Sequence, residues 1–214
     1  MTGQRRYRIA AQRTLTWLRA HAYNANGSGP PINRGKGDAT IATDTFSWAI
    51  CSLGPATLIE EGMDPEQIIE YAEDNCAVTV EYIRPEGTKV TVCGFDFSKY
   101  THLPRGGIVS AEWTAQVIVA CKVMADYFLQ NNDSQKAVVY RQKADYYLNE
   151  LNKMLICSPS KTGQGQGCLP YATAANVDTG HGWRTPKGDR TGSLASTAYA
   201  IFASIGYNPL SLSR

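Results

Sequence analysis

The chain has 214 residues, of which 43% are hydrophobic and 19% are charged, and this predicts one soluble globular domain with a full hydrophobic core. The 21 basic and 19 acidic residues give a formal net charge of +2, which is too balanced for the basic footprint of a nucleic-acid-binding protein. No apolar run approaches the roughly 20 residues that span a bilayer, and the N-terminus lacks the apolar core of a signal peptide. We therefore expect neither a nucleic-acid partner nor a membrane span.

The sequence opens directly into an amphipathic helical pattern. Residues 1–214 are therefore expected to form a single domain, either on its own or as one part of a longer protein. If the longer protein is exported, the domain lies outside the cytoplasm, so the sequence leaves the localisation open.

Helical periodicity dominates the first third of the chain. Apolar residues recur at helical spacing over residues 7–22, and again over residues 46–53 until Gly54-Pro55 ends the pattern. The segment Asp64-Pro-Glu-Gln67 is typical of a helix start, because an N-cap acid and a proline at the first helical position suit the free backbone N–H groups there. We expect the helix that follows to cover residues 68–75.

A short β-hairpin interrupts the helices. Apolar and polar residues alternate over residues 78–82 and 90–92, and residues 84–87 between them have the composition of a turn. Because two strands alone are marginally stable in water, this ribbon is expected to lie on a helical body.

The second half of the chain predicts two long helices and a final shorter one. Apolar faces cover residues 113–128 and 137–155, and the short turn between them makes these two helices antiparallel neighbours. The last helix covers residues 195–205 and ends at Gly206. Helices paired by short turns predict a mainly α fold of antiparallel helical hairpins, arranged as an α/α toroid, a partial toroid or a solenoid, with one small β-hairpin.

The six cysteines are spread through the chain without a Cys-x-x-Cys pair, and this spacing does not favour a zinc site. Cys51 and Cys121 fall on apolar helical faces and are expected to be buried thiols. Only Cys157 and Cys168, which bracket a glycine-rich segment, suggest a disulfide. We expect no metal and no cofactor.

Residues 178–186, with the sequence Asp-Thr-Gly-His-Gly-Trp-Arg-Thr-Pro, have the composition of a binding loop. Two glycines and a proline exclude regular structure, and the surrounding irregular stretch of residues 158–191 is longer than loops without a function usually are. His181, Trp183 and Arg184 are candidate binding residues, since an exposed indole suits the apolar face of a sugar ring. The plainer explanation of Asp178 is a turn-forming acid, and Asp178 with His181 supplies too few ligands for a metal.

Two further acids lie where helices begin. Ser110 is the expected N-cap of the first long helix, and Glu112 in its first turn would complement the helix dipole without any catalytic role. Alternatively, Glu112 faces a cleft beside Trp113 and Arg105, where partial burial raises its pKa for general-acid catalysis. In the segment Asp44-Thr-Phe-Ser-Trp48, Asp44 is most simply an N-cap and Trp48 most simply a core residue.

Several of these segments together resemble a known group of proteins. The segments are Asp44-Thr-Phe-Ser-Trp48, Arg105-Gly-Gly107, Ser110-Ala-Glu112-Trp113-Thr-Ala-Gln116, Asp178-Thr-Gly-His181-Gly-Trp183 and Ser196-Thr-Ala-Tyr199-Ala-Ile-Phe202. They resemble the C-terminal portion of bacterial α/α-toroid proteins akin to the six-hairpin glycosidases. The resemblance implies a cleft at one end of a helical barrel, lined by aromatic residues and served by acidic residues. The chain is too short for all six hairpins, so it would be a reduced toroid or one part of a longer one.

The leading hypothesis is a carbohydrate-active domain of glycoside hydrolase type. Hydrolysis needs two carboxylates about 5–5.5 Å apart when retaining and about 6.5–9.5 Å apart when inverting, and we assign Glu112 as the acid and Asp178 as the base. His181 and Arg184 would bind hydroxyls or a uronate. The remaining predicted substrate contacts are Asp44, Trp48, Arg105, Trp113, Tyr171 and Trp183.

Three alternatives remain open. A polysaccharide lyase would use His181 and Tyr171 to remove a proton beside a uronate carboxylate. A non-catalytic helical module would bind a glycan or a protein through the same aromatic loop. A third protein type would supply only one wall of an active site that is completed elsewhere.

Overall fold

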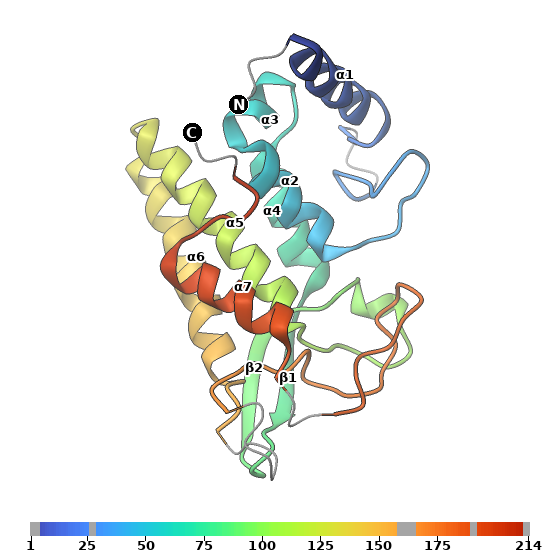
Figure 1. The fold of residues 1–214 in the computed structure, drawn as a ribbon, viewed down its shortest axis with the longest axis vertical. Coiled ribbons are helices and arrows are strands. Elements are labelled where there is room, and N and C mark those ends of the chain that lie inside the picture. Colours follow the sequence, from blue (N-terminus) through green and yellow to red (C-terminus); the bar gives the residue numbers. More distant parts are fainter. Residues whose placement is uncertain (1–4, 26–28, 158–165, 189–191, 212–214) are drawn as a thin grey trace.

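The computed structural model describes residues 5–25, 29–157, 166–188 and 192–211. The predicted mainly helical fold with one small antiparallel β-sheet is confirmed for these residues (Figure 1). The parts of the predicted irregular stretch at 158–165 and 189–191 lie outside the described residues. The elements in chain order are α1 (Arg5–His21), α2 (Thr43–Leu53), α3 (Pro55–Glu60), α4 (Pro65–Cys76), β1 (Ala77–Ile83), β2 (Lys89–Phe95), a 3₁₀-helix (Tyr100–His102), α5 (Ala111–Gln130), α6 (Ser134–Asn152) and α7 (Leu194–Ile205).

Capping chemistry sets where several helices begin and end. The Asp64 side chain accepts the backbone N–H of Glu66 at 2.9 Å and starts α4, as predicted. The hydroxyl of Ser110 accepts the N–H of Trp113 at 3.3 Å and starts α5. The left-handed conformation of Gly206, with φ of 71°, ends α7.

Two details of the α2–α3 region differ from the prediction. Ala42 is the N-cap of α2 and makes no side-chain cap, so Asp44 lies in the first turn and does not cap the helix. The sequence Gly54-Pro55 ends α2 as expected, but it also starts α3, because proline suits the first position of a helix. The Asp44 carboxylate is therefore available for other contacts.

Helix α5 is the centre of the hydrophobic core. It packs against α2, α6 and α7, and α6 returns antiparallel to it after the predicted short turn. The hairpin of β1 and β2 lies on this body, as predicted: Phe95 of β2 is fully buried and packs on Tyr147 of α6 with ring centroids 4.8 Å apart. The backbone N–H of Phe95 also donates to Thr114 of α5 at 2.9 Å.

Three long connections gather on one side of the molecule, coloured blue, green and orange in Figure 1. They are residues 29–42, 96–110 and the described parts of 166–193. A small apolar cluster of Ala42, Phe97, Ile108, Trp113 and Ala172 joins all three of these loops to the start of α5. The beginning of the most buried helix is therefore held directly beside the loops.

All six cysteines lie among the described residues and are free thiols. Cys51 and Cys121 are buried, as predicted, and burial raises the pKa of the Cys51 thiol to about 12. Cys157 is exposed and Cys168 half-buried, and the suspected disulfide between them is not formed. Within the described ranges, no helix combines the length and the apolar composition needed to cross a membrane.

Candidate functional site

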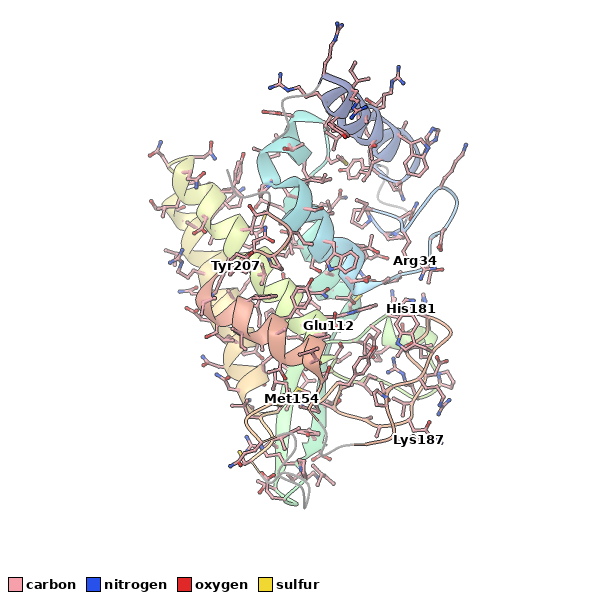
Figure 2. All side chains as sticks on the ribbon, viewed as in Figure 1. Arg34, Glu112, Met154, His181, Lys187 and Tyr207 are labelled. Carbon is pink, nitrogen blue, oxygen red and sulfur yellow. The ribbon has the colours of Figure 1, made fainter. Side chains whose placement is uncertain are left out.

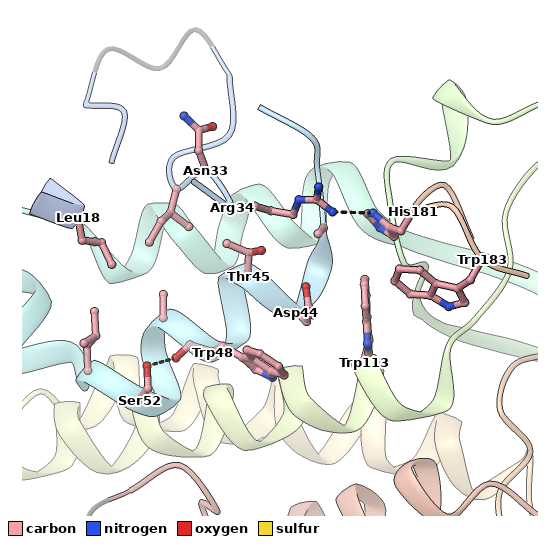
Figure 3. A pocket seen from close by; sticks show the side chains of 14 residues that line it. Leu18, Asn33, Arg34, Asp44, Thr45, Trp48, Ser52, Trp113, His181 and Trp183 are labelled. Carbon is pink, nitrogen blue, oxygen red and sulfur yellow. Dashed lines mark hydrogen bonds between the residues drawn. The ribbon is translucent and has the colours of Figure 1, made fainter. Parts of the chain in front are cut away.

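A pocket of about 370 Å³ lies where α2, the start of α5 and the loops meet (Figure 3). Five of the residues predicted from the sequence line it: Asp44, Trp48, Trp113, His181 and Trp183. Figure 3 shows Leu18 of α1 at one end of the pocket and Trp183 at the other. Segments more than 160 residues apart in the chain therefore share one pocket.

Aromatic rings form much of the pocket wall. Trp48 and Trp183 are 45% and 43% exposed, whereas Trp113 is buried and packs edge-on against Phe97. The ring of Trp183 stacks on His181 with centroids 5.3 Å apart, and its indole N–H donates to the Tyr171 hydroxyl at 3.2 Å. These two exposed indoles, of which Trp183 is held by His181 and Tyr171, are well suited to the apolar faces of sugar rings.

Two carboxylates, Asp44 at the pocket wall and Glu112 in the first turn of α5, interact electrostatically. Burial raises the pKa of both groups. The charge of Asp44 raises the pKa of Glu112 further, while His181 and Arg34 partly offset the effect of burial on Asp44. Asp44 lines the pocket, and Glu112 is half-buried in the first turn of α5, nearer the middle of the molecule than Arg34 and His181 (Figure 2).

Asp44 and Glu112 differ in the charges that surround them. The Arg34 guanidinium is a cation that favours the ionised form of Asp44, whereas the charge that acts on Glu112 is the negative charge of Asp44. These charges favour ionisation of Asp44 over ionisation of Glu112. Two neighbouring acids whose environments differ in this way can serve as a base and an acid at the same pH.

A buried polar side chain of α5 contacts Glu112. The amide of Gln116, one helical turn further on, donates to the Glu112 carboxyl at 3.2 Å, and Gln116 is only 1% exposed. Burial raises the pKa of the Tyr171 and Tyr199 hydroxyls, and the charge of Glu112 raises both further. Glu112 is therefore held by α5 and lies near two hydroxyls that stay protonated.

His181 fixes the loop that carries it. Its Nε2 lies 2.9 Å from the backbone oxygen of Phe97, and its Nδ1 lies 3.3 Å from the Arg34 guanidinium. Because the carbonyl oxygen can only accept, Nε2 carries the proton and Nδ1 accepts from Arg34. Both ring nitrogens are occupied, so the structure does not favour His181 as the base of a lyase.

Arg105 also positions this loop and does not face the pocket. Its guanidinium makes a two-point ion pair with the fully buried Asp96, at 2.8 and 2.6 Å, and its Nε donates to the backbone oxygen of Asp178. We predicted a substrate contact for Arg105, but all of these donors are used inside the protein. It is better described as a positioning residue.

The structure does not bring Asp178 and Arg184 to the pocket wall. The Asp178 carboxylate accepts the Gly180 N–H at 2.9 Å in a turn, which is the plainer explanation that the sequence offered. Arg184 is exposed and donates to Asn176. Asp44 lines the pocket and its charge acts on Glu112, so the structure favours Asp44 over Asp178 as the partner of Glu112, and the predicted pair of Glu112 with Asp178 stays a prediction.

Sequence reasoning missed three residues of this region: Arg34, Asp96 and Gln116. Asp96 carried a usable signal, because a lone acid between two phenylalanines at the end of a strand is buried only if it is paired. Arg34 lies in a polar loop with no motif, and Gln116 looks like any helical residue. Their roles depend on contacts between distant segments.

Among the residues that the structure describes, no three His, Cys, Asp or Glu side chains cluster as metal ligands would. The chain matches no protein-family model and no curated protein sequence.

Proposed function

We propose that this pocket binds a glycan and that Glu112 and Asp44 hydrolyse one of its glycosidic bonds. The observation that carries the proposal is the pair of neighbouring, partly buried carboxylates with raised pKa values beside a pocket lined by three tryptophans. Glycosidic hydrolysis requires two carboxyl groups in different protonation states, and carbohydrate sites use aromatic rings as platforms.

In this proposal Glu112 is the general acid. It keeps its proton because of burial and the charge of Asp44, and it donates this proton to the oxygen of the leaving sugar. The Asp44 carboxylate acts on the other side of the bond, either by attacking the anomeric carbon or by activating a water molecule. The stereochemistry of the product distinguishes these two routes.

The sugar contacts follow from the pocket wall. Trp48 and Trp183 would stack on sugar rings, and the hydrogen bond to Tyr171 holds the Trp183 ring in place. Arg34, at the pocket wall, contacts Nδ1 of His181 at 3.3 Å and is a cation that a sugar carboxylate could pair with. Trp113, Tyr171 and Arg184 remain predicted contacts, and of these only Trp113 lines the pocket.

We also propose that the helical hairpins belong to an α/α toroid, as the resemblance to six-hairpin glycosidases implies. The antiparallel packing of α5 and α6 supports this proposal, as do the long loops that gather on one side of the helices (Figure 1). The number of helices is smaller than in a full six-hairpin barrel.

The proposal is tested by incubating the protein with a panel of neutral and acidic polysaccharides and measuring new reducing ends. We expect turnover of one class, and a loss of about 10²–10⁴-fold in kcat for Glu112→Gln and for Asp44→Asn. Asp178→Asn is the matched control and should keep near-normal activity. If Asp178→Asn is as inactive as Glu112→Gln while Asp44→Asn is active, the pairing with Asp44 is wrong.

A non-catalytic glycan-binding module is the second candidate, and one observation favours it: Asp44 lines the pocket, whereas Glu112 lies beside it. Binding without turnover, unchanged in Glu112→Gln but lost in Trp48→Ala and Trp183→Ala, would select this candidate.

A further inference from the structure

Helix α1 is strongly basic, although the net charge of the whole chain is only +2. It holds five arginines, namely Arg5, Arg6, Arg8, Arg13 and Arg19, and no acidic residue, and none of its side chains is buried. None of the ion pairs among the described residues includes an α1 arginine. In contrast, Arg34, Arg84, Arg105 and Arg141 each pair with an acid. Blue-tipped side chains project from α1 into the solvent in Figure 2.

This helix starts at the pocket and leads away from it. Leu18, in the last part of α1, lines the pocket at the end opposite Trp183 (Figure 3). The C-terminal end of α1 packs on the body through Leu18 and the buried Ala22, and Gln12 bonds to Glu61 at 2.9 Å. The rest of the helix is about 20 Å of exposed surface at ~1.5 Å per residue.

Exposed aromatic and apolar side chains lie among these arginines. Trp17 is 45% exposed, next to Leu18 in the chain, and its ring lies 5.5 Å from that of His21. Ile9, Arg13 and Trp17 are spaced by four residues and therefore share one face of the helix. Guanidinium groups beside an exposed indole can pair with anionic groups and support a sugar ring on the same surface.

We propose that α1 is an extension of the binding site for acidic polysaccharides, with the chain running from the pocket along the helix. The carboxylate or sulfate groups of the polymer would pair with the α1 arginines, and Trp17 would contact a sugar ring beyond the pocket. The inference rests on the proposed glycan-binding function and names its substrate class. It predicts that long acidic chains bind more tightly than short ones.

The distribution of side chains favours a polysaccharide over an anionic membrane. A helix that lies in a membrane interface needs an apolar face without charges. On one exposed face of α1, Arg13 lies between Ile9 and Trp17. The opposite face carries the apolar residues at helical spacing over residues 7–22, and it is partly covered by the rest of the protein at Leu18 and at Ala22, just after the helix. The contact with the pocket also connects α1 to a glycan site.

The test measures the affinity of the full chain for a trisaccharide and a decasaccharide of polygalacturonate, with neutral oligosaccharides of the same lengths, by calorimetry at two salt concentrations. Because each exposed ion pair contributes little alone, three arginines are replaced together, in the variant Arg6→Gln, Arg8→Gln, Arg13→Gln. The affinity of this variant for the acidic decasaccharide should be lower by about tenfold or more. The affinity for the trisaccharide should change by less than about twofold, and the salt dependence of decasaccharide binding should decrease.

The matched control removes the same charge elsewhere. Lys89, Lys136 and Arg141 are exposed cations on β2 and α6, and replacing all three by glutamine should leave the decasaccharide affinity within about twofold of the wild type. An equal loss in this control, or an equal loss for both oligosaccharide lengths, would overturn the proposal. So would arginine-dependent binding to phosphatidylserine vesicles without any preference for the longer glycan.

The failure of this inference differs from the failure of the proposed function. If neutral glycans bind through Trp48 and Trp183 and acidic ones bind no better, only the role of α1 is wrong. If no glycan depends on either tryptophan and no product forms, the pocket proposal is wrong, and the extension along α1 is lost with it.

Discussion

Helices α5 and α1 both border the pocket, but they are built in opposite ways. Thirteen of the 20 residues of α5 are buried, whereas no residue of α1 is buried. α5 carries Glu112 and Trp113 and packs against α2, α3, α6, α7 and β2, while α1 contributes Leu18 and a surface of arginines without ion pairs. The comparison indicates that α5 fixes the chemistry of the site, whereas α1 offers charge that can change without cost to the fold.

The largest effect should come from the acid on α5. Glu112→Gln is expected to lower kcat by about 10²–10⁴-fold, because the proton donor is lost.

In the wild type, activity should fall as the pH rises through the raised pKa of Glu112, since only the protonated form of Glu112 donates a proton. Activity should also fall at low pH, as Asp44 becomes protonated. Profiles of kcat against pH measure both limbs, and a profile without a falling limb at higher pH would contradict the role of Glu112.

The packing that places the start of α5 should give the next largest effect. A Cβ atom at Gly94 would lie 2.6 Å from Val109 Cγ1 and 2.8 Å from the Thr114 hydroxyl. Gly94→Ala should therefore lower the free energy of unfolding by about 1–3 kcal/mol, as measured by urea denaturation. Gly35→Ala is the control, because a Cβ there meets no atom within 4 Å. Equal stability of the two variants would show that this contact relaxes freely.

Replacing Trp183, an exposed aromatic residue at one end of the pocket, should have a moderate effect on glycan binding and a small effect on stability. Trp183→Ala removes a 43% exposed ring, and glycan affinity should fall about 3- to 30-fold through lost stacking. Tyr207→Ala, at the far end of α7, removes a ring of similar exposure and should leave affinity unchanged. Loss of binding in both variants would point to a general effect on the fold.

The ionisation of Glu112 should also change the thermal stability of the protein in the absence of substrate. Burial raises the pKa of Glu112 in the folded protein above its value in the unfolded chain, so folding favours the protonated carboxyl. The contribution of Glu112 to the free energy of unfolding is therefore complete at a pH below its pKa in the unfolded chain, and it is lost as the pH rises through its pKa in the folded protein. Glu112→Gln should raise Tm by roughly 1–3 °C at pH 7 and leave it unchanged near pH 3.5. A Tm that is lower at pH 7 would indicate that the ionised carboxylate stabilises the fold.

The smallest effect is expected on α1. The triple variant Arg6→Gln, Arg8→Gln, Arg13→Gln removes three exposed side chains without ion pairs, and the free energy of unfolding should change by less than about 0.5 kcal/mol. Denaturation in urea measures this directly. A loss of 2 kcal/mol or more, on the order of a buried contact, would mean that α1 is part of the core and would remove the contrast with α5.

Much of the fold could be predicted from the sequence because its signals are local. The N-cap residues Asp64 and Ser110, the final Gly206 and the alternation of the hairpin all act within a few residues. Helix α3 was missed because Gly54-Pro55 is typical both of a helix end and of a helix start. Whether the hairpins close into a toroid depends on packing between distant elements, which no local pattern contains.

The candidate site was only partly predictable. Five pocket residues were identified by their chemistry, but the pairing of Glu112 with Asp44 joins two helices 68 positions apart in the chain. Asp178 was preferred because it lies in the aromatic loop, and there it forms a turn. The net charge of +2 also concealed the basic surface of α1, because a sum over the chain does not show where the charges lie.

The most direct test of the central claim is a crystal structure of the Glu112→Gln variant with a bound oligosaccharide. The account predicts sugar rings on Trp48 and Trp183, with a glycosidic oxygen within hydrogen-bond distance of the side chain at position 112 and Asp44 facing the anomeric carbon. An oligosaccharide bound elsewhere, or one whose glycosidic bonds all lie far from both side chains, would contradict it.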